Sequence, residues 1–231
     1  MSSTSASLSG SEPALPPAPS SQQENPASHF VVPIVSAAAF AHLLNDLIQA
    51  VLPSVYPMLK TQYSLSFSQI GWIALVYQVT ASLLQPWVGL YTDKHPKPYL
   101  LPSGMVMTLL GIAMLAFSSS YPMLLVSAAV VGIGSATFHP EASRVARMAS
   151  GGRFGTAQST FQVGGNSGSA IGPLLAAAIV IPYGQTAIAW FMLAAALAIF
   201  VLWRLTVWTL RHGQARTKVL ARGHAQGLDR N

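Results

Sequence analysis

Six stretches of mostly apolar residues, separated by short polar connections, run along this chain. A helix needs roughly 20 apolar residues to cross a bilayer, and stretches near that length lie at about residues 31–56, 69–91, 99–117, 122–142, 156–181 and 186–206. The connections carry Pro, Gly or Ser, which are typical of turns between helices. The pattern predicts an all-α integral membrane protein, with a six-helix transmembrane bundle over residues 29–206.

The fifth stretch contains two rows of residues with helical spacing. One row consists of glycines, namely Gly164, Gly168 and Gly172. The other row consists of amides, namely Gln158, Gln162 and Asn166. The two rows lie on roughly opposite faces of one helix. Because small residues let membrane helices approach closely, we expect the glycine row to be a packing seam that ends in a bend at Pro173. We expect the amide row to face a cavity.

The composition supports the membrane assignment and excludes several kinds of chemistry. The 231 residues are 52% hydrophobic and only 8% charged, whereas charged residues make up about 25% of an average soluble protein. There is no cysteine, so we expect no disulfide, no cysteine-based metal site and no thiol catalysis. The residues predict no cofactor.

The basic residues lie almost entirely on one side of the predicted membrane. Of the 12 Lys and Arg residues, Lys60 alone lies in a connection on the other side. The positive-inside rule therefore places both termini in the cytoplasm, as in a plasma (inner) membrane protein. It also accounts for most of the net charge of +6 without nucleic acid as a partner. We expect residues 1–28 to be a disordered cytoplasmic tail and residues 207–231 to be a basic cytoplasmic tail or linker.

Ionisable residues inside the first span are the main candidates for function, because charge is costly in hydrocarbon. His42 and Asp46 are four residues apart and share a helix face, and Asn45 lies beside them. A carboxylate at this depth suits a group that binds and releases a proton or handles substrate. A structural hydrogen bond between the two side chains is the alternative. The pair also has the spacing of two metal ligands, but without a third ligand we predict no metal site.

The fourth span ends with a second group of candidates. His139 and Glu141 flank Pro140, which can kink the helix. Glu141 has a structural alternative, because Arg144 follows three residues later and could pair with it. His139 has no such local partner. We assign both to proton or substrate handling with Asp46. Because the first and fourth spans each begin a set of three helices, the chain also fits the inverted 3+3 repeats of known transporters.

The connection between the second and third spans resembles the loop motif of the major facilitator superfamily. Four residues match that motif, namely Gly89, Asp93, Lys94 and Lys97. Pro96 replaces the second glycine of the motif. The segment from Gly168 to Pro173 is similar to the GxxxGP signature of drug–proton antiporters in the same superfamily. The resemblance implies that the loop acts as a conformational gate.

Three longer segments resemble the fosmidomycin-resistance branch of this superfamily. They read HLLNDLIQAVLPSVYPMLK, FHPEASRVA and FQVGGNSGSAIGPLLAA. The resemblance implies efflux of a small drug or metabolite by proton antiport with alternating access. Ala128 stands where many such antiporters carry an arginine linked to coupling, so coupling would use Asp46 or the His–Glu set. No Lys or Arg lies deep in the spans, so protonated His42 and His139 are the expected cationic contacts for an anionic drug.

Several alternatives stay open at this point. The superfamily has two six-helix halves, so we expect this chain to be an N-terminal half or a truncated carrier, partnered by a second half or by a second copy in a homodimer. An uncoupled or symport metabolite permease and a non-transporting interaction protein are other readings. An intramembrane serine protease would use the string from Gly165 to Gly168, but the last span has no histidine to activate Ser167. We therefore predict no enzyme.

Overall fold

The computed structural model describes residues 29–95 and 97–228, with side chains as far as residue 212, and the regular structure within these ranges is helical. The predicted tail at residues 1–28 lies outside the described residues. The helices are α1 (Val32–Ser54), α2 (Tyr56–Gln62), α3 (Phe67–Lys94), α4 (Leu100–Ala116), α5 (Tyr121–Met148), α6 (Phe154–Leu175), α7 (Ile181–Tyr183) and α8 (Phe191–Leu228). A π-helical turn, Ala176–Val180, joins α6 to α7, and a 3₁₀ turn, Gln185–Trp190, leads into α8.

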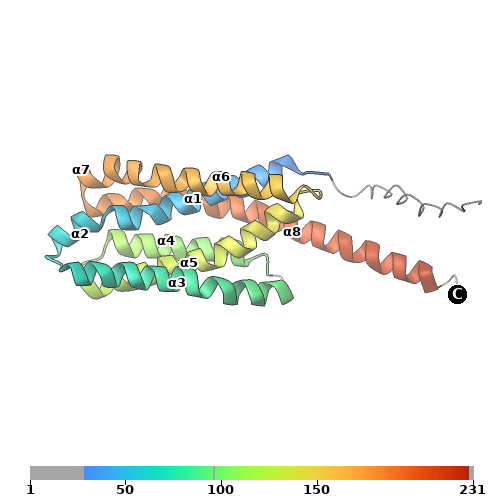
Figure 1. The fold of residues 1–231 in the computed structure, drawn as a ribbon, viewed down its shortest axis with the longest axis horizontal. Helices are drawn as coiled ribbons and strands as arrows, with labels where there is room; N and C mark the ends of the chain where they lie inside the picture. The colour runs from blue at the N-terminus through green and yellow to red at the C-terminus, as the bar shows by residue number, and fades with distance from the viewer. Residues whose placement is uncertain (1–28, 96, 229–231) are drawn as a thin grey trace, which may run out of the picture.

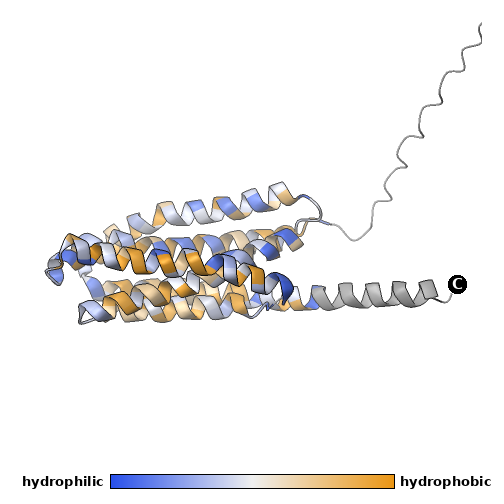
Figure 2. Cartoon of the chain, turned by 60° about the horizontal axis from the view of Figure 1, so that its bottom comes forward, coloured by the Kyte–Doolittle hydropathy of each residue, from blue (hydrophilic) through white to orange (hydrophobic). Residues whose placement is uncertain are grey.

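Helix length and composition fit a membrane-spanning bundle. Five helical stretches of the described chain are long and apolar enough to cross a membrane, namely Val32–Gln62, Phe67–Lys94, Tyr121–Met148, Phe154–Tyr183 and Gln185–His212. The sixth apolar helix, α4, is shorter, with 17 residues. Hydrophobic residues occur along every helix of the bundle (Figure 2), and many large hydrophobic side chains are exposed. The structure therefore has the all-α membrane architecture that the sequence predicts.

The helices pack in two groups, which Figure 1 shows one above the other. In one group α6 lies along α1, and this pair makes the most extensive helix contact of the bundle. In the other group α5 packs between α3 and α4. α8 contacts both groups, through α4 and α1. Contact between α1 and α5, which belong to different groups, is less extensive. The looser packing at this interface leaves room for polar side chains.

The glycine row of α6 lies directly against the backbone of α1. A Cβ added at Gly164, Gly168 or Gly172 would collide with α1 carbonyl oxygens. These oxygens belong to residues that also recur every four positions, namely Ala39, Leu43 and Leu47. Because residue numbers rise together along both helices, α1 and α6 run parallel. The small residues thus let two backbones meet, which is how helices associate where lipid removes the usual hydrophobic driving force.

The helix boundaries differ from the predicted spans at the start and end of α3. The helix begins at Phe67, before predicted residue 69, because Ser66 and Gln69 form a capping box. The Ser66 backbone N–H donates to Gln69 Oε1 at 2.9 Å, and the Gln69 N–H donates to Ser66 Oγ at 3.2 Å. At its other end α3 continues to Lys94. Asp93 and Lys94 therefore lie in the last helical turn, in place of the predicted loop.

Two other helices continue through segments that we predicted as connections or tails. α5 extends to Met148, beyond the predicted end at residue 142, because Val145 and Ala146 are buried in the core. α8 extends to Leu228 through part of the predicted tail. The first span is divided where Pro53 and Pro57 flank the junction of α1 and α2. Hydropathy marks where the membrane ends, and a helix can continue beyond that point.

A buried amide ties several elements together at the end of the bundle where α1 and α2 meet. Gln185 Nε2 donates to the Leu115 carbonyl at 2.8 Å and to Ser118 Oγ at 2.7 Å. Its Oε1 accepts from Gln62 Nε2 at 2.7 Å and from the Tyr63 hydroxyl at 2.8 Å. The side chain is buried. One amide thus joins the α2 end, the α4 end and the start of the last span.

We expect Gln185→Met to lower the free energy of unfolding by about 1–3 kcal/mol, because it removes the hydrogen bonds of a buried amide to Gln62, Tyr63, Leu115 and Ser118. Methionine keeps the length of the side chain, so the change tests hydrogen bonding more than volume. Thermal unfolding of the detergent-solubilised chain measures the effect. The control is Gln78→Met, because Gln78 is exposed and donates to Ser82. Equal stability of the two variants would show that the network contributes little.

Candidate functional site

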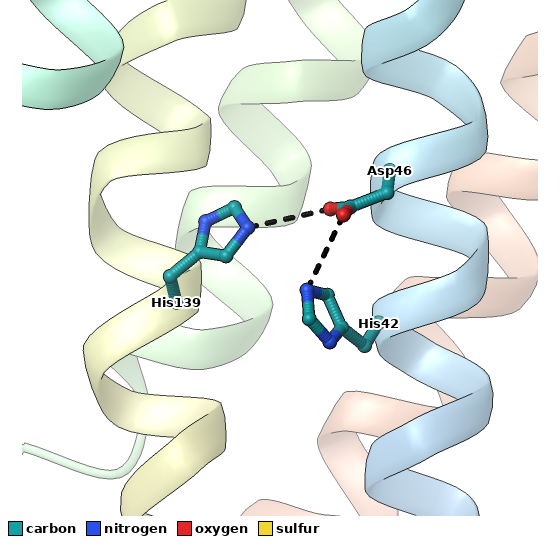
Figure 3. Close-up of side chains that lie close together, drawn as sticks. All are labelled: His42, Asp46 and His139. Atoms are coloured by element: carbon teal, nitrogen blue, oxygen red, sulfur yellow. Dashed lines mark ion pairs between the residues drawn. The ribbon is translucent and has the colours of Figure 1, made fainter. Parts of the chain in front are cut away.

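Two imidazoles and one carboxylate meet between the helix groups. His42 and Asp46 come from α1, and His139 comes from α5 (Figure 3). His42 Nε2 lies 3.3 Å from Asp46 Oδ2, and His139 Nε2 lies 3.3 Å from Asp46 Oδ1. The sequence placed His42 and Asp46 on one helix face. The structure adds His139 from 93 residues further along the chain (139 − 46).

Both imidazoles are held by backbone carbonyls on their far side. His42 Nδ1 lies 2.9 Å from the Phe161 carbonyl oxygen of α6, and His139 Nδ1 lies 3.1 Å from the Ser135 carbonyl oxygen one turn earlier in α5. The His42 ring also stacks on the Phe161 ring, with 4.0 Å between centroids. Gly165 makes this possible, because a Cβ there would collide with the His42 ring. The Nε2 atom of each ring is thereby turned toward Asp46.

Exposure increases across the cluster from His42 to His139. The side chains of His42, Asp46 and His139 are 2%, 16% and 27% exposed. Asn45 Nδ2 donates to Asp46 Oδ1 at 2.9 Å, so a third polar group contacts the carboxylate. His42 is therefore enclosed by protein, while Asp46 and His139 reach an open space.

That space is a cavity of about 230 Å³ next to the cluster. Its lining consists of Asp46, Gln49, Ala50, Pro53, Tyr77, His139 and Ser169. Gln49 Oε1 accepts from the Tyr77 hydroxyl at 2.7 Å and from Ser135 Oγ at 2.9 Å. Gln49 Nε2 is buried and has no hydrogen-bond partner within the described residues. The cavity wall thus offers an acid and an imidazole, with the buried Gln49 amide beside them.

Three polar residues of the lining, namely Gln49, Tyr77 and Ser169, are not among the site residues that the sequence predicts. Gln49 follows Asp46 by three positions on the same face of a largely apolar helix, which is a signal that was present in the sequence. Ser169 follows Asn166 by three positions and extends the amide row. Tyr77 carried no comparable signal, because aromatic residues are common throughout such spans.

The amide row does not line this cavity. Gln158, Gln162 and Asn166 are exposed on α6. Gln158 Oε1 accepts from Ser143 Oγ at 3.1 Å, and Gln162 Nε2 donates to Asn166 Oδ1 at 3.2 Å. The predicted place beside Asp46 is taken by Ser169. The three amides therefore form an exposed polar strip along α6.

Glu141 forms the local ion pair that was its structural alternative. Its side chain is fully buried, and Oε2 contacts the Arg144 guanidinium one turn further along α5. Glu141 Oε1 and Arg144 Nε are buried without a hydrogen-bond partner within the described residues. No contact between Glu141 and Asp46 is found in the described part of the chain, so Glu141 lies outside the cluster.

The predicted gate lies at the end of α3. Asp93, Lys94 and Lys97 are exposed, and within the described ranges none of them forms an ion pair. Gly89 faces α5, where a Cβ would lie 3.7 Å from Pro140 Cβ. The role of this segment as a gate stays a prediction.

The cluster contains a third possible metal ligand beside His42 and Asp46. We predicted no metal site because the sequence offered two ligands without a third, and His139 supplies that third ligand. One ligand atom from each of the three residues lies within 4.8 Å of the others. The set could therefore hold a cation other than a proton.

Ser167, the nucleophile that an intramembrane serine protease would use, forms an ordinary helix contact. Its Oγ donates to the Val163 carbonyl at 2.8 Å, as a serine in the middle of a helix commonly does.

An apolar helical bundle with ionisable side chains at a cavity between its helices is the architecture of a membrane transporter. The sequence profile of the Major Facilitator Superfamily matches residues 38–226, which is most of the chain. The chain belongs to the Major Facilitator Superfamily. This superfamily consists of carriers of small molecules and, in general, not of enzymes.

Two relatives show where in the superfamily the chain lies. It is 57% identical over 175 residues to the fosmidomycin resistance protein of Escherichia coli (strain K12), covering 76% of this chain and 43% of that protein. It is 48% identical over 178 residues to an uncharacterized MFS-type transporter of Bacillus subtilis (strain 168), covering 77% of this chain and 44% of that protein. The chain therefore spans less than half the length of the curated relatives it matches.

Proposed function

We propose that this chain takes part in the export of a small drug or metabolite, with fosmidomycin as the model compound, in exchange for protons. The name of the Escherichia coli relative, the fosmidomycin resistance protein, supports the choice of fosmidomycin as the model substrate. The observation that carries the proposal is Asp46, an acid placed between two imidazoles at the wall of an open cavity between the helices of a membrane bundle. Acids in such positions are typical of proton relays and substrate paths.

The proposed mechanism is alternating access around this cavity. Asp46, His42 and His139 exchange protons as the cavity opens to one side and then to the other. When protonated, the two imidazoles attract an anionic compound. The segment from Gly89 to Lys97 acts as the gate. The packing supports this proposal, because the tight α1–α6 seam lets that pair move as one unit.

The cellular setting is part of the proposal. Both termini lie in the cytoplasm and the bundle spans the plasma (inner) membrane, which follows from the one-sided distribution of Lys and Arg. A second six-helix unit, either a C-terminal half or another copy of this chain, completes the transport path.

Uptake of radiolabelled fosmidomycin into proteoliposomes that contain the full chain tests the proposal. With an acidic interior, protons leaving the vesicle drive the drug inward, so we expect uptake several-fold above that of protein-free liposomes. Uptake should collapse when a protonophore removes the gradient. Uptake that does not depend on the proton gradient would favour an uncoupled permease. No uptake by folded protein, whether alone or dimeric, would favour a non-transporting interaction protein.

A further inference from the structure

We propose that His42, Asp46 and His139 form a binding site for one divalent transition-metal ion, with Zn²⁺ as the model ion, and that an open coordination position of this ion faces the cavity. The inference goes beyond the proposed proton exchange and does not depend on it. It follows from the donor atoms of the three side chains, from the groups that orient those side chains, and from their place at the cavity wall.

The three side chains present electron pairs toward one another. A carbonyl oxygen accepts hydrogen bonds and cannot donate them, so the Phe161 and Ser135 carbonyls hold the hydrogen of each neutral imidazole on Nδ1. The Nε2 atom of each neutral ring then carries a lone pair, and it faces an oxygen of the Asp46 carboxylate (Figure 3). Because such electron-rich atoms repel one another, the arrangement is stabilised by a cation that lies between them.

The spacing of these atoms suits a single ion. In a tetrahedral zinc site the nitrogen and oxygen ligands lie about 2.0–2.2 Å from the metal, and therefore roughly 3.4 Å from one another. His42 Nε2 and His139 Nε2 each lie 3.3 Å from a carboxylate oxygen of Asp46. A charge-assisted hydrogen bond from nitrogen to a carboxylate is shorter, at about 2.7–2.9 Å. One ligand atom from each of the three residues lies within 4.8 Å of the others, so an ion has to draw them together only slightly.

Each of the three ligands also has the kind of outer partner that orients metal-binding side chains in proteins. The Nδ1 atoms of the two histidines lie 2.9 and 3.1 Å from backbone carbonyl oxygens. Asp46 Oδ1 accepts from Asn45 Nδ2 at 2.9 Å. Such contacts fix the orientation of the ligand and raise its basicity. The side chains are therefore held in a binding arrangement by the protein itself.

The donor set and the cavity decide the class of ion and its open position. Imidazole ligands suit zinc and neighbouring transition metals, whereas Ca²⁺ and Mg²⁺ prefer sites made of oxygen atoms. Three protein ligands leave a fourth position on zinc for water or for another ligand. Since Asp46 and His139 line the cavity of about 230 Å³, the cavity is both the entry path of the ion and the place of this fourth ligand. Its expected class is water or an anionic oxygen donor, because the ion retains one positive charge beside a single carboxylate.

Titration of the full chain with Zn²⁺ tests the site. Tag-free protein in detergent is treated with EDTA, freed of the chelator and titrated by calorimetry, with and without excess Mg²⁺. We expect one Zn²⁺ per chain at this site, bound equally well when Mg²⁺ is present. In His139→Gln the affinity should fall at least about a hundredfold, because loss of even an outer partner of a metal ligand costs roughly 10–100-fold. The matched control is His95→Gln, which removes an exposed histidine at the end of α3 and should bind like the parent chain.

X-ray absorption at the zinc edge of the loaded parent chain gives a second measurement that needs no variant. We expect two imidazole ligands and otherwise oxygen ligands, and this result decides the question if His139→Gln fails to fold. The site is rejected if folded parent chain binds no Zn²⁺, if folded His139→Gln binds as tightly as the parent, or if the spectrum lacks two imidazoles. Zinc binding without drug-driven proton flux in the ion-free chain would retain the site and reject the transport proposal, and flux without zinc binding would do the reverse.

Discussion

Gly168→Leu is expected to destabilise the bundle by about 3 kcal/mol or more, because overpacking against backbone cannot be relieved by a change of rotamer. A Cβ at Gly168 would collide with the carbonyl oxygen of Leu43 and would come within 2.9 Å of the Leu43 carbonyl carbon and the Leu47 nitrogen. All three contacts are backbone atoms of α1. A leucine at this position therefore forces α1 and α6 apart along their whole seam.

A second glycine of α6 provides the control. A Cβ at Gly155 meets nothing within 4 Å, so Gly155→Leu tests the change of residue without the collision. Because leucine favours a helix over glycine by roughly 1 kcal/mol, this variant should be as stable as the parent or slightly more stable. Thermal unfolding and gel filtration in detergent compare the two. An equal loss of stability at both positions would contradict the packing role of the seam.

The membrane bundle was predictable because the bilayer imposes simple rules on sequence. Each span must be apolar over a fixed length, and its backbone must be helical to satisfy its own hydrogen bonds. The spacing of Gly164, Gly168 and Gly172 likewise shows one face for close packing. What the spacing cannot show is the partner. Many apolar helices could lie on that face, and the choice of α1 depends on packing throughout the bundle.

The candidate site was predictable only where its residues share one helix. His42 and Asp46 are four positions apart, so helix geometry alone places them together. His139 was a candidate by its chemistry, but its contact with Asp46 depends on how α5 crosses α1, which no local pattern encodes. Ser169 was missed for the same reason, because the rotation of α6 about its axis decides which polar residue of a row reaches the cavity.

Asp46→Asn is expected to abolish proton coupling, with a fall of at least about tenfold in substrate-driven proton flux, equivalent to roughly 1.4 kcal/mol or more. Asparagine keeps the size of the side chain and can still form hydrogen bonds, but it has no carboxyl proton to exchange. The folded bundle should survive, because the α1–α6 seam does not involve this side chain.

Proton movement triggered by fosmidomycin, followed with a pH-sensitive dye in proteoliposomes, tests the central claim of proton exchange at Asp46 most directly. Parent chain and Asp46→Asn are reconstituted in equal amounts, and gel filtration first shows that both are folded. We predict that the drug drives protons across the membrane with the parent chain and that this signal disappears with the variant. Full proton flux with folded Asp46→Asn protein would contradict the account.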